Sequence, residues 1–320
     1  TVAFLYLRWP FVYFFSFHQL TLNYEHLTAM KARQVQSKLI TTTLYTENIY
    51  NKVNNDTALH DLLYNDYKDV NTAQKALTQY DGFEKILSNT AILSGIKLYI
   101  NNNSFKLQKE CNDFFPITDS IQNTNWCRQA SSTRGNFWKS SLRIGKNGVL
   151  YWELNYYCHI PIPQTSSYAV LVLTVSNDYL KNLIQRDEYD IYISVNSDPV
   201  FFSSDRSYSG NSLPVPLDST SKKQITGRQK INGKNSVCSL TTLTPYNTED
   251  QINILVSSRN ALYYIHRLRI VLIGTFIFTI GISALIIFLY ARYFSNRIQT
   301  LRLAMHKVSH NNYRITSNLP

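Results

Sequence analysis

The feature that most constrains this chain of 320 residues is a run of 21 uncharged, mostly apolar residues, 270–290. A helix rises about 1.5 Å per residue, so this run is long enough for the roughly 30 Å hydrocarbon core of a bilayer. Tyr263 and Tyr264 precede the run, and Tyr290 and Tyr293 close it, as aromatic residues do at membrane interfaces. A buried helix of a soluble protein is the alternative, but such a length without a charge argues against it. The sequence therefore predicts a transmembrane helix at residues 270–290.

The N-terminal segment, residues 1–22, is apolar and aromatic but contains Arg8, Pro10 and His18. We expect a first membrane span here, incomplete because the sequence begins at Thr1 rather than at a methionine. A secretory signal peptide is the alternative, but no small-residue cleavage site follows the segment. Two spans would place everything between them outside the cell, and the positive-inside rule leans slightly towards a cytoplasmic C-terminus.

The net charge of +11 raises the question of a nucleic-acid partner. Such binders gather their basic residues on one stripe, whereas here the excess is divided between two separate segments. We interpret the excess as partly related to the membrane and expect no nucleic-acid partner. The first group is Arg292, Arg297, Arg302, Lys307 and Arg314, and the segment 291–320 that contains it has no acidic residue. The second group is Lys222, Lys223, Arg228, Lys230 and Lys234.

Four cysteines, Cys111, Cys127, Cys158 and Cys238, lie in the part expected outside the cell. A disulfide can form there, and Cys111 and Cys127 are the nearest pair in the sequence. Unpaired cysteines buried in a core are the alternative, because free cysteine is commonly buried. The spacing of a zinc site is not found, and both alternatives stay open.

Helices are predicted first along the chain. Residues 23–54 contain neither Gly nor Pro, and their apolar residues recur near helical spacing. Asn55 and Asp56 offer an N-cap for a short helix that begins at Thr57. A further helix is expected over residues 72–89.

Strands follow the helices. Asn147-Gly148 and Asn232-Gly233 are typical of the tight turns of β-hairpins, because both central residues of such a turn need a positive φ. The order of helices followed by strands of antiparallel type predicts an α+β fold. Strands are expected over residues 95–102, 137–160, 168–176, 190–204 and 225–245, with one helix at 177–185.

Residues 248–251, Thr-Glu-Asp-Gln, fit the capping box at the start of a helix. Glu249 and Asp250 would also favour the positive end of the helix dipole. No proline follows until Pro320, so we expect one helix to run from Thr248 through the membrane span.

After the span, Ile298, Leu301, Met305 and Val308 are spaced by three, four and three residues. This is the a/d seam by which a helix packs against a partner helix. A helix lying alone on the lipid surface is the alternative.

Residues 292–313 resemble the start of the HAMP linker of YesM-like sensor histidine kinases of Gram-positive bacteria. The four seam residues and Tyr313 match, whereas the usual proline ahead of the leucine is absent, with Arg297 near its place, and Asn311 stands where glycine is common. The region between the predicted spans resembles a double Cache domain. That resemblance is carried by the long first helix, "GIKLYI", the aromatic stretch 126–138, "YWELNYY", "AVLVLTVSNDYLKNLI" and "YDIYISVNSDPVFFSSDRSYSG".

The resemblance implies an α+β membrane receptor with PAS-like antiparallel sheets, a long N-terminal helix and flanking transmembrane helices. The distal Cache subdomain would bind a small molecule, with aromatic side chains as walls and an arginine for a carboxylate or phosphate. The alternative is that these aromatic residues are simply core. The Tyr-x-Arg-x-Trp-Tyr order of amino-acid-binding Cache receptors is not found, so an amino-acid ligand is not supported. The candidate residues are Tyr99, Trp126, Arg128, Trp138 and Trp152.

The expected organisation follows from these observations. It comprises residues 1–22 as an N-terminal transmembrane segment, 23–180 as helix and distal Cache subdomain, 181–247 as proximal Cache subdomain, 248–269 as juxtamembrane helix, 270–290 as transmembrane helix and 291–320 as partial HAMP linker.

The function implied is that of the sensory and transmembrane part of a histidine kinase, in a multi-pass homodimer of the bacterial cell membrane. Its partners would be an extracellular small molecule or a solute-binding protein, the lipid bilayer and a cytoplasmic response regulator. His306 and His310 lack the context of a phosphorylated histidine, and the chain has no ATP-binding motif. We therefore expect no cofactor in these residues, with ATP and Mg²⁺ used by a kinase domain beyond Pro320. A chemotaxis-type receptor and a membrane-anchored binding module are the alternatives.

Overall fold

The computed structural model describes residues 2–65, 67, 69–101, 113–133, 135–144, 150–162, 167–184, 189–196, 198–202, 225–231, 234–258 and 260–309. The chain divides into two units. We call Leu22–Leu262 the sheet unit, and Thr1–Thr21 with Tyr263–Pro320 the terminal unit.

Helices open the chain, as the sequence predicts. Helix α1 (Val2–Asn54) is continuous, and its apolar positions at helical spacing, such as Val35 and Leu39, are buried. Helix α2 (Thr57–Tyr64) begins as expected, because the Asp56 carboxylate accepts hydrogen bonds from the N–H groups of Ala58 and Leu59.

The single helix predicted for residues 72–89 is wrong: two helices, α3 (Val70–Gln79) and α4 (Gly82–Ser88), occupy this region. Tyr80 is extended between them, and its hydroxyl donates a hydrogen bond of 2.7 Å to Asp56. A Cβ atom at Gly82 would collide with the Tyr80 side chain. The predicted helix is therefore divided where Tyr80 contacts Asp56, the N-cap of α2. Gly82 is close to this break, and glycine has a low helix propensity.

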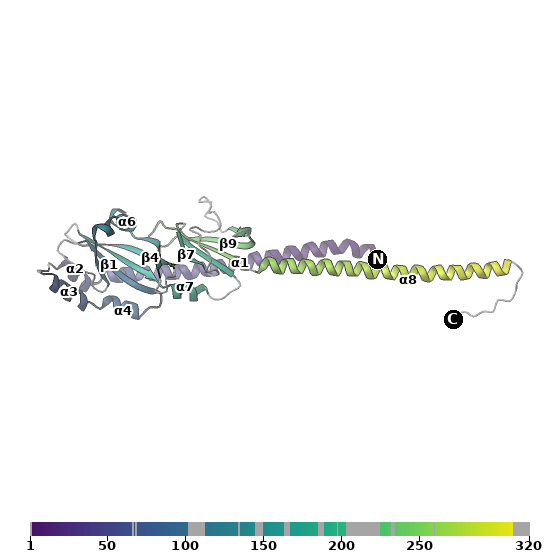
Figure 1. The fold of residues 1–320 in the computed structure, drawn as a ribbon, viewed down its shortest axis with the longest axis horizontal. Coiled ribbons are helices and arrows are strands. Elements are labelled where there is room, and N and C mark those ends of the chain that lie inside the picture. Colours follow the sequence, from purple (N-terminus) through teal and green to yellow (C-terminus); the bar gives the residue numbers. More distant parts are fainter. Residues whose placement is uncertain are drawn as a thin grey trace. The chain divides into compact units, whose positions relative to one another are not determined.

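Five strands form a first sheet, which we call sheet A, in the order β2-β1-β5-β4-β3. Two of them, β1 and β4, are labelled in Figure 1. The pair β1–β2 is parallel and the other pairs are antiparallel. The strands are β1 (Leu93–Asn101), β2 (Phe114–Pro116), β3 (Phe137–Ile144), β4 (Leu150–Pro161) and β5 (Tyr168–Val175), and the helices α5 (Asp119–Gln122) and α6 (Asn125–Thr133) precede β3.

Both faces of sheet A are covered. Strand β5 is buried from Ala169 to Val175, which explains its nearly continuous apolar sequence. One face packs with α1 through residues such as Leu98 and Leu171. The other face packs with α6 around Tyr157 and Val172.

Helix α7 (Asn177–Ile184) leads to a second antiparallel sheet, sheet B, in the order β7-β6-β10-β9-β8. Its strands are β6 (Tyr189–Val195), β7 (Asp198–Phe202), β8 (Ile225–Ile231), β9 (Lys234–Leu243) and β10 (Ile252–Ser258). Helix α1 contacts both sheets: the Gln36 amide donates to the carbonyl of Thr242 in β9, and the Tyr50 hydroxyl donates to the carbonyl of His159 in β4.

The helix predicted to begin at Thr248 is wrong. Residues 252–258 form β10, the middle strand of sheet B, and α8 (Ala261–Ser309) begins after it. Every residue of β10 is buried, and the strand pairs with β6 on one side and β9 on the other. A capping box is a local signal, and here the two sets of ladder hydrogen bonds and the burial of β10 outweigh it.

The two predicted hairpins are formed, since β3 pairs with β4 and β8 pairs with β9 in antiparallel register. The Asn147-Gly148 and Asn232-Gly233 turns themselves lie outside the described residues. Three cysteines, Cys127, Cys158 and Cys238, are buried free thiols whose pKa values burial raises. Cys111 lies outside the described residues.

Helix α8 contains the run 270–290 that the sequence predicts to span the membrane. Within the described residues, Ala261–His306 is the one helix long and apolar enough to cross a bilayer, with a mean hydropathy of 2.7 in its most apolar window. A second span in residues 1–22, and with it a multi-pass topology, is not supported.

Candidate functional site

The candidate site lies on the face of sheet A that is turned away from α1. Strand β4 shows the division between the faces: Leu154 and Tyr156 point into the core shared with α1, whereas Tyr157 belongs to the cluster beneath α6. Alternation along the strand places Glu153 and Asn155 on the same face as Tyr157. That face carries an aromatic cluster at one end and a polar network at the other.

The aromatic cluster lies beneath α6. Tyr99 stacks on Phe115 with ring centroids 5.2 Å apart and lies 5.0 Å from Trp126. Trp126 in turn stacks on Tyr157 at 5.2 Å, and Tyr157 on Phe137 at 5.1 Å. Burial raises the pKa of Tyr157 to about 12. These rings pack against one another, so this end of the face is part of the hydrophobic core.

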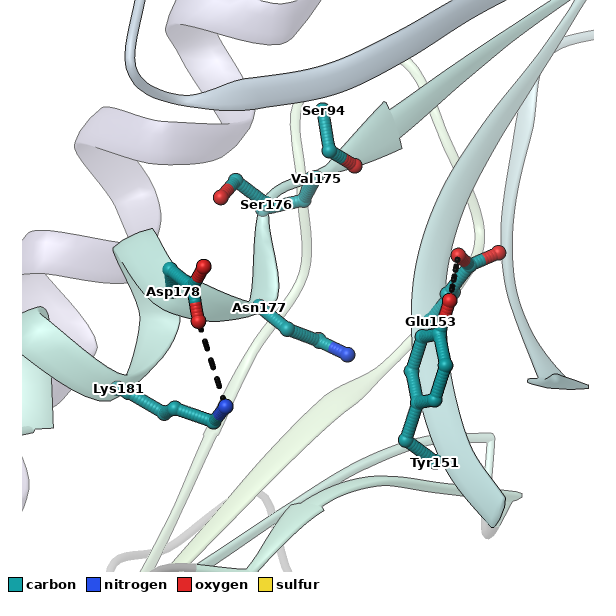
Figure 2. A pocket seen from close by; sticks show the side chains of 8 residues that line it. All are labelled: Ser94, Tyr151, Glu153, Val175, Ser176, Asn177, Asp178 and Lys181. Carbon is teal, nitrogen blue, oxygen red and sulfur yellow. Dashed lines mark hydrogen bonds and ion pairs between the residues drawn. The ribbon is translucent and has the colours of Figure 1, made fainter. Parts of the chain in front are cut away.

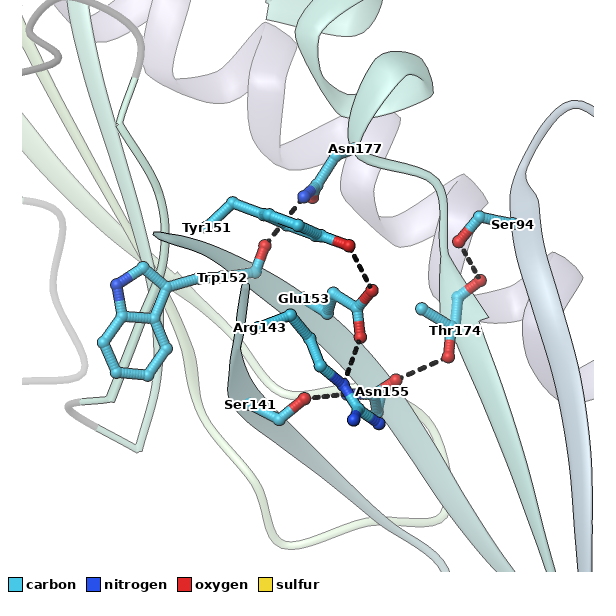
Figure 3. A network of polar contacts seen from close by, with 9 residues as sticks. All are labelled: Ser94, Ser141, Arg143, Tyr151, Trp152, Glu153, Asn155, Thr174 and Asn177. Atoms are coloured by element: carbon cyan, nitrogen blue, oxygen red, sulfur yellow. Dashed lines mark hydrogen bonds and ion pairs between the residues drawn. The ribbon is translucent and has the colours of Figure 1, made fainter. Parts of the chain in front are cut away.

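The five predicted ligand-binding residues do not converge. Tyr99 and Trp126 meet in the aromatic cluster, but Trp138 lies on the opposite face, stacked on Tyr156 with ring centroids 4.6 Å apart. The exposed Arg128 guanidinium donates to the carbonyl of Asn123, which lies between α5 and α6. The indole of Trp152 points away from the polar network (Figure 3).

The polar network joins β3, β4 and β5. Asn155 is buried; its amide nitrogen donates to Ser141 at 2.7 Å, and its oxygen accepts from the Thr174 hydroxyl at 2.7 Å (Figure 3). Two residues before Asn155 in β4, the Glu153 carboxylate accepts from Arg143 Nε and from the Tyr151 hydroxyl, both at 3.2 Å. The side chain of Glu153 is only 17% exposed, so its carboxylate is held by these two donors within a largely enclosed site.

A cavity of about 280 Å³ opens beside this network (Figure 2). Strand β5 pairs with β4 as far as Asn155 and Thr174, and then turns away into α7. Strand β4 continues beside β3 alone to Leu150, so sheet A loses a strand at this point. The cavity lies where β5 stops pairing with β4. It is lined by Ser94, Tyr151, Glu153, Val175, Ser176, Asn177, Asp178 and Lys181.

The first turn of α7 forms one wall of the cavity. Ser176 caps this helix, since its hydroxyl oxygen accepts from the N–H of Tyr179. Asn177 donates from its amide nitrogen to the carbonyl of Trp152 at 2.9 Å. Its amide oxygen is buried and has no hydrogen-bond partner among the described residues. Asp178 and Lys181 pair with each other at 3.3 Å on the exposed side of the helix.

The chemistry of the lining favours a ligand that donates hydrogen bonds. The nearby Glu153 carboxylate raises the pKa of Tyr151, whose hydroxyl donates a hydrogen bond to it. The Glu153 carboxylate is an acceptor in this lining, which hydroxyl or ammonium groups of a ligand can satisfy. No group of three His, Cys, Asp or Glu side chains suited to a metal ion occurs in the described part of the chain.

A larger cavity of about 590 Å³ lies where α1 ends, beside α2 and α4. Its central polar groups already satisfy one another: Tyr80 donates to Asp56, which also caps α2, and Lys85 pairs with Asp81. We therefore place the candidate site at the smaller cavity, which is lined by the Glu153 carboxylate.

Sequence reasoning missed the residues of this site. The alternation of polar with apolar residues along 150–158 places Glu153 and Asn155 on one face, and Thr174 is a polar residue within an apolar strand. Those two signals were present in the sequence. The position of Asn177 beside Trp152 depends on the turn of the chain out of sheet A and has no sequence signal.

Comparison with solved structures places the fold. The chain is similar to the periplasmic sensory domain of the Campylobacter jejuni chemoreceptor Tlp1, with a TM-score of 0.55 and 10% identity over 77% of this chain and 98% of that one. It is also similar to the extracellular domain of a candidate histidine kinase, vpHK1S-Z8, with a TM-score of 0.52 and 12% identity over 75% of this chain and 97% of that one. No protein-family model matches the sequence, and the comparison with curated proteins gives no match. The sheet unit therefore has the fold of the Cache-type sensory domains of histidine kinases and chemoreceptors.

Proposed function

We propose that this protein is a membrane receptor of bacteria whose sheet unit lies outside the cytoplasm and binds a small polar molecule. The observation that carries the proposal is the cavity beside Glu153, in a fold shared with extracellular sensory domains. The apolar helix α8 supports attachment to the membrane. A solute-binding protein that delivers the molecule is an alternative partner.

The ligand we expect is small and carries hydroxyl or ammonium groups. A volume of about 280 Å³ is just below the usual range of small-molecule sites, which begins at about 300 Å³. Glu153 is already paired with Arg143, so it would accept from a neutral donor as readily as from a cation.

A binding screen tests this proposal. The full chain in lipid nanodiscs is titrated with polyols, hexoses, diamines and amino acids, and binding is measured by calorimetry. We expect at least one hydroxylated or amine compound to bind, and Glu153→Gln to weaken it by about tenfold or more, because a charged hydrogen bond is lost. Glu84→Gln, on an exposed face of α4, is the matched control and should leave the Kd unchanged. Binding that is insensitive to Glu153→Gln would place the site elsewhere.

We also propose that binding is signalled through α8 to a histidine kinase domain C-terminal to it, in a homodimer. Support comes from the HAMP-like spacing of Ile298, Leu301, Met305 and Val308 on α8. The kinase domain would use ATP and Mg²⁺ and pass its phosphoryl group to a response regulator. A chemotaxis-type receptor is the second candidate, favoured by the similarity to the sensory domain of Tlp1.

Incubation of the product of the natural reading frame with labelled ATP separates the two candidates. Label on a histidine beyond α8 is the outcome expected for a kinase. A product that takes up no label and continues as a long heptad coiled coil would instead be a chemoreceptor.

A further inference from the structure

The carboxylate of Asp250 lies between the two sheets. The residue is 8% exposed, and its two oxygens accept hydrogen bonds from different sheets. Oδ2 accepts from the backbone N–H of Trp138 in β3 at 2.6 Å, and Oδ1 accepts from the amide nitrogen of Asn196, which follows β6, at 2.6 Å. Strand β3 is an edge strand of sheet A, so Asp250 satisfies an N–H that has no partner strand.

Asn196 ties the same carboxylate to sheet B. Its oxygen accepts from the N–H of Gln251 at 2.8 Å, and its own N–H donates to the carbonyl of Gln251 at 2.9 Å. The residue has a φ of 49°, a left-handed conformation that asparagine tolerates better than most residues. Asn196 therefore fixes the segment that contains Asp250 at the start of β10.

We call the hydrogen bonds of Asp250 to Trp138 and Asn196 the Asp250 link. It joins a strand beside the cavity to the strand that precedes α8. Strand β3 carries Arg143, which is bonded to Glu153 at the cavity, as well as the Trp138 N–H. Strand β10 ends at Ser258, and α8 begins at Ala261. Asp250 is hydrogen-bonded to β3 and lies two residues before β10. A displacement of β3 at the cavity can therefore move β10 through Asp250.

Apolar contacts also join the sheets, since Leu154 of sheet A and Ile193 of sheet B belong to one core. Such contacts are not directional and tolerate sliding, whereas charge-assisted hydrogen bonds fix a register. We propose that Asp250 is the positioning residue that sets the register of sheet B against sheet A, and that movement of β3 on ligand binding reaches α8 through it. The second half of this proposal rests on the proposed receptor function.

The test compares two neighbouring carboxylates in the full chain in nanodiscs. Asp250→Asn keeps the shape of the side chain but removes its charge and places an amide donor opposite two existing donors. Glu249→Gln makes the same chemical change at an exposed position one residue earlier. Hydrogen exchange at the Trp138 amide should become about tenfold faster or more in Asp250→Asn and stay unchanged in Glu249→Gln.

A second readout separates register from local capping. Spin labels on exposed Ser132 of α6 and exposed Asn235 of β9 report the distance between the sheets by pulsed electron paramagnetic resonance. We expect a broader distance distribution in Asp250→Asn and no change in Glu249→Gln. Faster exchange at Trp138 with an unchanged distribution would overturn the proposal, because Asp250 would then be only a local cap of the strand edge.

Should Asp250→Asn not fold, Asn196→Gly gives the same information. Glycine keeps the left-handed backbone and removes only the side-chain bonds. Its matched control is Asn247→Gly, at another left-handed position with a φ of 58°. The distance should broaden in the first variant and not in the second; equal distributions would overturn the proposal. Neither readout uses a ligand, so a failed ligand screen would contradict the receptor function without affecting the register.

Discussion

Glu47 is a carboxylic acid buried inside the sheet unit. Its side chain lies on α1 and is 6% exposed, and Oε1 has no hydrogen-bond partner among the residues that the structure describes. It faces Tyr156 and the thiol of Cys158 in β4, with Tyr50 on its own helix. Burial raises its pKa from 4.5 to about 7. The folded chain therefore binds a proton at Glu47 that the unfolded chain releases at mildly acidic pH.

This difference predicts that stability falls as pH rises. The contribution of Glu47 to the free energy of unfolding is fully present below about pH 4.5 and is lost progressively as the pH approaches 7 and passes it. The loss is at most about 3.4 kcal/mol, from a shift of about 2.5 pKa units at 1.36 kcal/mol per unit. Urea unfolding of the chain at pH 5 and pH 8, followed by tryptophan fluorescence, measures it.

Glu47→Gln should remove most of this pH dependence, because the amide has the shape of the protonated acid and does not ionise. Glu84→Gln, at an exposed position on α4, should keep the full dependence. Equal slopes in the parent chain and in Glu47→Gln would show that Glu47 does not cause the effect.

At the scale of the element, α8 carries the residues of the predicted seam on its surface. Ile298, Leu301 and Met305 are 62%, 63% and 71% exposed in the single chain. The side chain of Val308 lies outside the described residues. Exposed apolar side chains spaced by three and four residues are the arrangement that a partner helix buries in a coiled coil.

Cysteine crosslinking tests whether a second copy of the chain is that partner. Leu301 is on the seam, whereas Leu303 is 65% exposed but lies on another face of α8. In a homodimer packed through the seam, Leu301→Cys should crosslink on the order of tenfold faster than Leu303→Cys, because only seam side chains approach to disulfide distance. The parent chain supplies the background from its own cysteines, and similar rates for the two variants would refute the seam.

At the scale of the whole molecule, the sheet unit is organised around contacts distant in sequence. Residues of both sheets and of α1 share one core, including Leu39, Leu154 and Ile254. The Asp250 link and the contacts of α1 with both sheets add directional bonds to this core. The cavity, the link and the strand before α8 all depend on this arrangement, so we expect function to be sensitive to the relative register of the sheets.

Local chemistry made much of this predictable from the sequence. The uncharged run 270–290, the N-cap at Asp56 and the apolar strand 168–176 depend on the residues themselves and their immediate neighbours. The α+β order and the two hairpins follow from similar short-range signals, and all of these agree with the structure.

Tertiary structure decided the rest. Thr248–Gln251 has the residues of a helix cap, yet β10 follows because Ile252 pairs with Val195 and Leu243, partners that no local pattern identifies. Trp138 and Tyr99 were grouped by residue type, but strand alternation and pairing send them to opposite faces of sheet A. The site beside Glu153 exists because β5 leaves the sheet one residue after Thr174 while β4 continues. Which strands pair depends on the hydrogen bonds and burial that segments distant in the sequence can offer. These are known only from the folded chain.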